Sequence, residues 1–415
     1  MTWPMKRLRY LATFNPPVPS SVRTDAEGDY PLLPMDSINE FTETGAPEVR
    51  PVGDLLNGYS YLEPTDVAYA KVTPCFENGK GLIGSVLDGP TFATTEITVL
   101  RPHNSVNQRF LGYLLQSSAF RHAAIASMTG AGGLKRVSET AMRDLRVPAP
   151  PLEEQRLIAD YLDRETAEID AFIADLLRAR KLLGYRLKSI ADEAIHAALP
   201  KVDQSRKGRY GTPDHPFGND WIPLGALAAV GTGSLDTQDA SENGIFPFFV
   251  RSDNIELSES ATHHGEAVLT AGDGAGVGKV FHHYVGYFAV HQRVYVIEPG
   301  PKLEGRFLYW TLRTYFGDIV LAGTAKSTVE SLRRPMLTGF PIPSLPFAEQ
   351  RRIAEALDRA NDEISEQLAD AQKAIDLAQE RRSALITVAV TGQIDVTKQG
   401  VSAAEQLRDE LEVHV

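Results

Sequence analysis

The chain contains one stretch twice, first as "PLEEQRLIADYLDRETAEID" (residues 151–170) and again as "PFAEQRRIAEALDRANDEIS" (residues 346–365). Eleven of the twenty positions are identical, at a constant offset of 195 residues. Self-similarity at a fixed distance is the mark of a repeated structural unit. These two stretches therefore decide how the rest of the chain is divided.

The repeat extends through the residues that precede each copy. The segment 109–111 matches 306–308, and Leu8 and Leu11 match Leu224 and Leu227. The offset changes along the chain, so the two halves differ by insertions and deletions. We divide the 415 residues into a first block (1–150), a central segment (151–200), a second block (201–345), a distal segment (346–395) and a tail (396–415).

The central and distal segments read as long helices. Apolar residues recur at spacings of three, four or seven from about 155 to 197 and again from 353 to 385, with Gly392 as the expected end of the second helix. That period is typical of one helix face or of a coiled-coil seam. At 1.5 Å per residue each helix would be roughly 60–65 Å long.

Two arrangements fit helices of this length. Each helix could pack on its own block with a solvated outer face, or the two could pack on each other as an antiparallel coiled coil. A helix this long extends beyond an ordinary domain, which favours the pair.

The two blocks read as strand-rich. Strand-like runs surround Asn78-Gly79, a dipeptide typical of hairpins, and the stretch "GDGAGVGKV" (272–280) occupies the corresponding place in the second block. This stretch is not a phosphate-binding loop, because Asp273 and Val280 stand where a glycine and a hydroxyl residue are needed, and strand-like sequence follows. Short helices are expected near 109–120 and 306–316. The predicted class is α+β, with two β-rich domains alternating with two long helices.

Motifs that could carry chemistry are incomplete. The stretch "FNPPV" (14–18) has Val18 where adenine-N6 methyltransferases carry a base-stacking aromatic residue, and only thirteen residues precede Asn15. Adjacent histidines such as His282 and His283 would point to opposite faces of a strand, so they cannot simply share a metal. We therefore expect no catalytic residue and no metal site.

Composition favours a cytoplasmic protein without a membrane span. There is one cysteine, Cys75, and no apolar run approaches the roughly 18 residues of a transmembrane helix. The net charge of −12 argues at first against nucleic acid. Most of that charge lies in the helical segments, because the first and second blocks carry only −1 and −2.

The tandem of block, long helix, block and long helix resembles the specificity subunit of Type I restriction-modification systems. The resemblance covers nearly the whole chain and is carried by "PAPPLEEQRLIADYLD" and "PIPSLPFAEQRRIAEALD", with "AKVTPCFENGKG" and "LTAGDGAGVGKVFHHY" resembling target-recognition domains. It implies that each block reads one half of a split double-stranded DNA target. The paired helices would set the spacer and dock two methyltransferase subunits.

The same resemblance assigns the chemistry to partners. Methyltransferase subunits would use S-adenosylmethionine to methylate adenine, and restriction subunits would add ATP- and magnesium-dependent cleavage. This chain would hold no cofactor. The competing interpretation is an adaptor that does not bind DNA, with two β-rich ligand-binding modules on a coiled-coil strut; the net acidity favours it, whereas the motifs and the repeat do not.

Candidate residues follow from side-chain chemistry, since Arg and Lys suit guanine and Asn and Gln suit adenine. The DNA-binding candidates are Lys71, Thr73, Asn78, Lys80, Lys135, Arg251, Asp273, Lys279, His282, His291, Gln292, Arg293 and Lys326. The partner-docking candidates at the two helix starts are Glu154, Gln155, Arg156, Glu349, Gln350 and Arg351.

Overall fold

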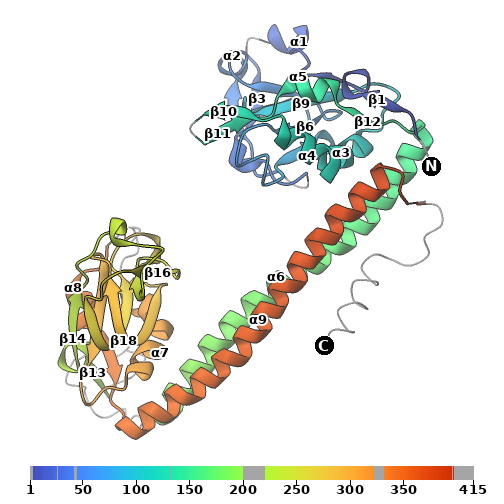
Figure 1. Cartoon of the computed structure of the whole chain (residues 1–415). Helices are drawn as coiled ribbons and strands as arrows, with labels where there is room; N and C mark the ends of the chain where they lie inside the picture. Colours follow the sequence, from blue (N-terminus) through green and yellow to red (C-terminus); the bar gives the residue numbers. More distant parts are fainter. Residues whose placement is uncertain are drawn as a thin grey trace. The chain divides into compact units, whose positions relative to one another are not determined.

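The structure is a computed structural model that describes residues 3–25, 27–41, 44–131, 133–199, 220–321, 331–394 and 396. It consists of two compact units, one formed by Met1–Leu177 with Gln372–Val415 and the other by Arg178–Ala371. Each unit contains one strand-rich block and parts of both long helices (Figure 1). The fold is α+β, as predicted.

The first block contains two four-stranded sheets. One has the order β2-β9-β6-β7 and the other the order β4-β3-β8-β5. The strands are β2 (Ala12–Phe14), β3 (Asp29–Leu33), β4 (Glu48–Pro51), β5 (Ser60–Leu62), β6 (Val67–Ala70), β7 (Gly81–Ile83), β8 (Thr91–Ala93) and β9 (Ile97–Pro102).

The second block contains one six-stranded sheet with the order β14-β19-β17-β18-β15-β16. The strands are β14 (Ala228–Thr232), β15 (Phe246–Phe249), β16 (Ile255–Ser258), β17 (His263–Ala271), β18 (Phe281–Val290) and β19 (Val294–Pro299). The order is that of the first block if β17 is read as β5 plus β6, and β18 as β7 plus β8. In both blocks the strands of the central hairpin are antiparallel, whereas β3 pairs with β8 and β15 pairs with β18 in parallel.

The remaining short elements also occur in pairs. Strand β1 (Met5–Arg7) pairs with β12 (Arg146–Pro148), and β13 (Trp221–Pro223) pairs with β20 (Pro341–Pro343). A small hairpin of β10 (Thr129–Ala131) and β11 (Leu134–Arg136) belongs to the first block. The helices of the blocks are α1 (Ser20–Arg23), α2 (Val52–Leu55), α3 (Gln108–Gln116), α4 (Ser118–Ala126), α5 (Glu139–Asp144), α7 (Gly305–Phe316) and α8 (Arg334–Thr338). The short helices expected near 109–120 and 306–316 are confirmed.

The two long helices are α6 (Leu152–Ala198, 47 residues) and α9 (Phe347–Val390, 44 residues). At 1.5 Å per residue they are about 70 and 66 Å long, slightly more than expected. Gly392 has φ +74°, the left-handed conformation that commonly follows a helix, which confirms the predicted end of α9.

The helices pack on each other in opposite directions within each unit. In the first unit Ile169, early in α6, packs on Ala378, late in α9. In the second unit Leu187, late in α6, shares a core with Ile353 and Leu357, early in α9. The antiparallel pair predicted from the apolar spacing is thus confirmed.

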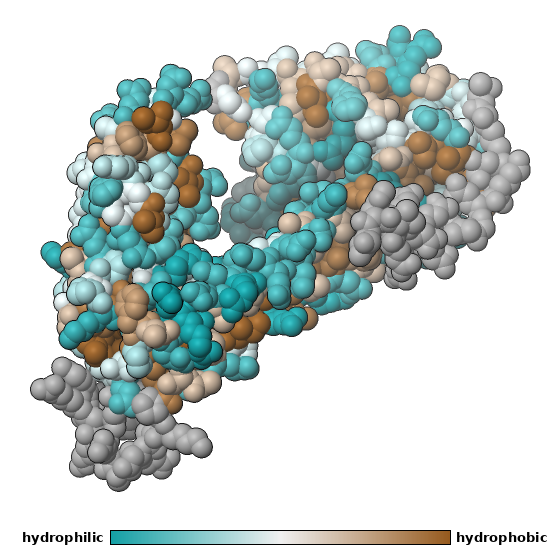
Figure 2. All heavy atoms as spheres, turned by 60° about the horizontal axis from the view of Figure 1, so that its bottom comes forward, coloured by the Kyte–Doolittle hydropathy of each residue, from teal (hydrophilic) through white to brown (hydrophobic). Residues whose placement is uncertain are grey.

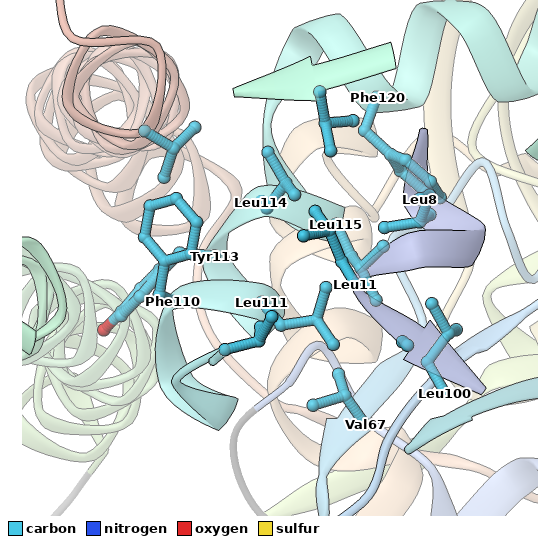
Figure 3. Packing of buried hydrophobic residues seen from close by; sticks show 14 of the residues in the cluster. Leu8, Leu11, Val67, Leu100, Phe110, Leu111, Tyr113, Leu114, Leu115 and Phe120 are labelled. Atoms are coloured by element: carbon cyan, nitrogen blue, oxygen red, sulfur yellow. The ribbon is translucent and has the colours of Figure 1, made fainter. Parts of the chain in front are cut away.

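Each unit has a core that joins its block to the helices. In the first unit Phe110 and Tyr113 of α3 point toward the helices, while Leu111 and Leu115 point into the block (Figure 3). On the face shown in Figure 2, hydrophilic side chains cover most of the surface of the helices, and hydrophobic patches are small. None of the described helices is both long and apolar enough to cross a membrane.

Candidate nucleic-acid interface

Each block is fastened to the start of its long helix by a buried glutamine. Gln155 accepts a hydrogen bond from the backbone N–H of Asn107 (2.8 Å) and donates to the carbonyls of Ser105 (3.1 Å) and Pro150 (2.8 Å). Both Gln155 and its counterpart Gln350 are only 3% exposed. These two residues were predicted to dock partners, but burial gives them a structural role instead.

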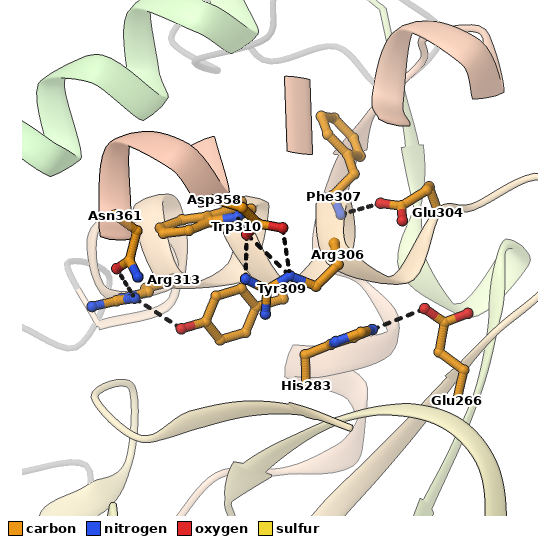
Figure 4. Close-up of polar contacts among 10 residues, drawn as sticks. All are labelled: Glu266, His283, Glu304, Arg306, Phe307, Tyr309, Trp310, Arg313, Asp358 and Asn361. Carbon is orange, nitrogen blue, oxygen red and sulfur yellow. Dashed lines mark hydrogen bonds and ion pairs between the residues drawn. The ribbon is translucent and has the colours of Figure 1, made fainter. Parts of the chain in front are cut away.

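A second fastening joins each block to an aspartate about two helical turns beyond the glutamine, at Asp163 and Asp358. Arg306 donates to Asp358, and Trp310 donates its indole N–H to the same carboxylate at 2.8 Å (Figure 4). In the first unit Arg109 and Tyr113 make the equivalent contacts with Asp163, the tyrosine at 2.8 Å. The internal repeat matches Arg109 with Arg306, but sequence reasoning missed their ion pairs with Asp163 and Asp358. The signal for these pairs was that both the arginine and the aspartate recur in the two halves, each beside apolar helix positions.

The other predicted docking residues remain at the surface. Arg156 and Arg351 have side chains that are 51% and 67% exposed, and among the described residues each forms an ion pair with a glutamate on its own helix. Glu349 is 31% exposed and bonded to Arg352, and Glu154 accepts a hydrogen bond from Trp3. Their role in docking stays a prediction.

In the second block three of the predicted DNA-binding residues come together. Asp273 receives a hydrogen bond from Arg251 at 3.0 Å and another from Arg293 at 2.5 Å. Partial burial would raise the pKa of Asp273, but these hydrogen bonds outweigh it and lower that pKa. Arg251 and Asp273 line a groove together with Glu256 and the exposed Gly274–Ala275 turn.

Four more candidates in the second block differ in how exposed they are. His291 is only 3% exposed and lies 3.4 Å from Asp236, so it offers little of its surface at the wall of the groove. Gln292 and Lys279 are exposed, and His282 is half-buried with its ring 3.2 Å from the Ser252 carbonyl. Lys326 lies outside the described residues.

The glycine-rich stretch forms the turn between β17 and β18, not the start of a long helix. Gly274 and Gly278 have φ of +72° and +71°, and a Cβ on Gly276 would lie 2.3 Å from the Arg251 carbonyl. Glycine is therefore needed at these positions, because two of them have positive φ and the third passes directly against the backbone of Arg251. The interpretation as a turn, rather than a phosphate loop, is confirmed.

In the first block the corresponding turn is arranged differently. Lys135 is exposed and Lys71 half-buried, whereas Thr73 is 8% exposed and its hydroxyl bonds the Gly133 carbonyl at 3.0 Å. Arg136 binds both oxygens of Glu96, at 2.7 and 2.9 Å. Burial and this hydrogen bond remove most of Thr73 from the surface that DNA could reach.

Asn78 and Lys80 lie on a different side of the same turn. Both line a cleft of about 680 Å³ that Asp170 and Arg382 of the long helices complete within the first unit. The Lys80 ammonium donates to the Met35 carbonyl at 2.8 Å, whereas Asn78 is exposed. Asn78-Gly79 was predicted to mark a hairpin; β6 and β7 do pair, but through the longer connection 71–80.

The residues considered for other chemistry are held in local contacts. The Asn15 amide donates to Glu139 at 2.7 Å and accepts from the Val99 N–H at 3.0 Å. His264 packs on Tyr287, while His283 contacts Glu266 at 2.8 Å. Among the described residues no three His, Cys, Asp or Glu side chains form a group that could hold a metal ion.

The chain is similar to known proteins in sequence and in fold. The family described as "Type I restriction modification DNA specificity domain" matches residues 53–177 and 220–371. The EcoAI specificity subunit of Escherichia coli is 35% identical over 159 residues, which are 38% of this chain and 26% of that protein. The EcoDI specificity subunit of the same species is 32% identical over 177 residues, 42% of this chain and 39% of that one.

These matches cover only about a quarter to two fifths of the length of the curated relatives. A solved chain from a study of "complex assembly" and "conformational transition of the type I R-M system" covers 94% of this chain and 98% of its own length. Its TM-score is 0.64 at 18% identity, so the likeness is one of fold.

Proposed function

The chain belongs to the family of Type I restriction-modification DNA specificity domains, and from that premise we propose that it is the DNA-recognition subunit of such a complex. Each block reads one half of a bipartite double-stranded target. The alternative is an adaptor with no DNA ligand, which only the net acidity of the chain supported. It is not favoured, because the family match identifies a DNA specificity domain whatever the net charge.

One observation carries this proposal. The two blocks share one strand order and are fastened to their helices by equivalent contacts of Gln155 and Gln350, yet their corresponding turns carry different charged residues. A constant scaffold with variable loops is what two readers of different sequences require.

We assign catalysis to partner subunits. The sequence contains no intact methyltransferase motif, so S-adenosylmethionine would be held by two methyltransferase subunits, and ATP and magnesium by restriction subunits. The docking sites are the exposed arginines Arg156 and Arg351 at the two helix starts, with the half-buried Glu154 and Glu349 beside them. Methyl transfer to DNA by the purified chain alone would contradict this assignment.

Partners also supply most of the positive surface. The first and second blocks carry −1 and −2, whereas DNA affinity depends on cations that neutralise phosphates. The lone chain should therefore bind DNA weakly and with a shallower salt dependence than its methyltransferase complex. Equal affinities and slopes would refute this.

The function is tested by mapping methylated adenines in DNA modified by the chain together with its methyltransferase partner. We expect one motif made of two specified half-sites separated by unspecified bases. No methylation, or a motif without a gap, would overturn the proposed function.

A further inference from the structure

Three side chains from distant parts of the second block form one exposed ionic cluster. Arg251 follows β15, Asp273 follows β17, and Arg293 lies in the turn between β18 and β19. The side chains of the two arginines are 46% and 61% exposed, whereas that of Asp273 is 17% exposed. The carboxylate thus lies behind two guanidinium groups that face solvent.

Each arginine uses only one nitrogen to bind the carboxylate. Arg251 and Arg293 each contact Asp273 through Nη1, and neither guanidinium forms a hydrogen bond or ion pair with any other described residue. The edge formed by Nε and Nη2 is therefore open on both. This edge is a planar fork that can bind two acceptors at once.

Asp273 holds the forks in place. Partial burial acts to raise its pKa, but the hydrogen bonds from Arg293 and Arg251 lower it below the ordinary range, so the carboxylate stays charged near neutral pH. Two arginines fixed by one anion lose less side-chain freedom on binding a ligand than free arginines do.

The surroundings favour base edges over phosphates. Glu256 lines the same groove, and Asp236 lies beside His291 at its wall. With Asp273, these carboxylates repel a phosphate but not a neutral base. Guanine offers two acceptors, O6 and N7, at the spacing of an arginine fork in the major groove.

The first block lacks this arrangement at the equivalent turn. The Lys71 N–H bonds the Glu96 carbonyl at 2.8 Å, and the Gly272 N–H bonds the Arg293 carbonyl at 2.8 Å, so Glu96 stands where the second block has Arg293. Glu96 also binds Arg136 through both Nε and Nη2, which occupies its fork. The open pair of forks is therefore a property of the second block.

We propose that Arg251 and Arg293 read guanine in the second half-site, with Asp273 as the residue that positions them. This inference rests on the proposed function and names the bases that one block recognises. The second half-site then contains at least one G·C pair whose identity depends on these arginines.

The test compares Arg251→Lys, Arg293→Lys and Asp273→Asn in the complex with its methyltransferase partner. Lysine keeps the charge but loses the fork, and asparagine removes the anion that orients both arginines. Methylation rates are measured on DNA that carries each base substitution in each half-site. Lys302→Ala, an exposed cation elsewhere in the block, is the control.

We expect each arginine variant to lose about 5- to 150-fold of the preference for guanine at one position of the second half-site. The first half-site should keep its preferences, and the control should change neither. A uniform loss over all sequences, or a second half-site without a G·C pair, would overturn this inference alone. Absence of any bipartite motif in the wild-type complex would instead overturn the proposed function beneath it.

Discussion

Gln155 and Gln350, 195 positions apart, make the same three hydrogen bonds in the two units. Gln350 accepts from the N–H of Glu304 at 2.9 Å and donates to the carbonyls of Lys302 at 3.1 Å and Leu345 at 2.8 Å, as Gln155 does with Asn107, Ser105 and Pro150. One amide thus joins three segments: the turn before the short helix, the end of the block and the start of the long helix.

Replacing either glutamine should destabilise its own unit. Gln155→Leu leaves the half-buried Asn107 N–H and two carbonyls without this partner, which costs about 1–3 kcal/mol for the unmatched polar groups. Urea unfolding followed by hydrogen exchange should place the loss in the first unit for Gln155→Leu and in the second for Gln350→Leu. Gln367→Leu, on the exposed face of α9, is the control, and an equal effect there would refute the assigned role.

Alkaline pH should weaken the fold through Tyr61. Burial, followed by the nearby charge of Glu63, raises the pKa of Tyr61 to about 12. A group whose pKa is raised on folding contributes stability that is complete below its unfolded value near 10 and is lost as the pH rises toward 12. Tyr61→Phe should therefore lose less stability than the wild type between pH 9 and 11.5 in urea unfolding. Identical slopes would show that Tyr61 does not titrate as described.

The exposed helix-start arginines should govern the number of docked methyltransferase subunits. Arg156→Glu and Arg351→Glu reverse a charge on the two equivalent surfaces, and each should remove one of two methyltransferase subunits in native mass spectrometry. Arg359→Glu, exposed on α9 two turns from Arg351, should leave both bound. If all three variants keep two subunits, docking lies elsewhere.

The helical period of the apolar residues allowed most of the correct predictions. This spacing predicted the antiparallel helix pair, and it also indicated that the glutamines lie on a buried helix face. Gln155 precedes Ile158 and Ala159 by three and four positions, so it lies on the buried face of α6. A glutamine on that face, repeated in both copies, indicated a structural contact rather than a docking surface.

The clusters formed across strands could not be predicted in the same way. Arg251, Asp273 and Arg293 were each candidates, but their meeting depends on the alignment of β15, β17, β18 and β19, which no local pattern specifies. Thr73 and His291 are polar residues near predicted turns, which is why the sequence indicates them as DNA contacts. Whether these two side chains are buried depends on which face of each turn packs against the rest of the block. That packing is set by the tertiary fold and not by a local sequence pattern.

The paired helices should control the spacer of the target. Inserting four residues after Ala179, about one helical turn, adds roughly 6 Å along the axis of α6, close to two base pairs at about 3.4 Å each. The methylated motif should keep both half-sites and change only the number of bases between them. A change in the half-site bases, or an unchanged spacer in an active complex, would show that the helices do not set the distance.

The central claim is that each block reads its own half-site, and exchanging one block tests it most directly. Residues 201–345 are replaced by the second block of another family member, and methylated adenines are mapped in DNA modified by the complex of each chain. The account predicts that one half-site changes to that of the donor while the other half-site and the spacer stay as in the wild type. An active complex in which both half-sites change, or neither does, would contradict it.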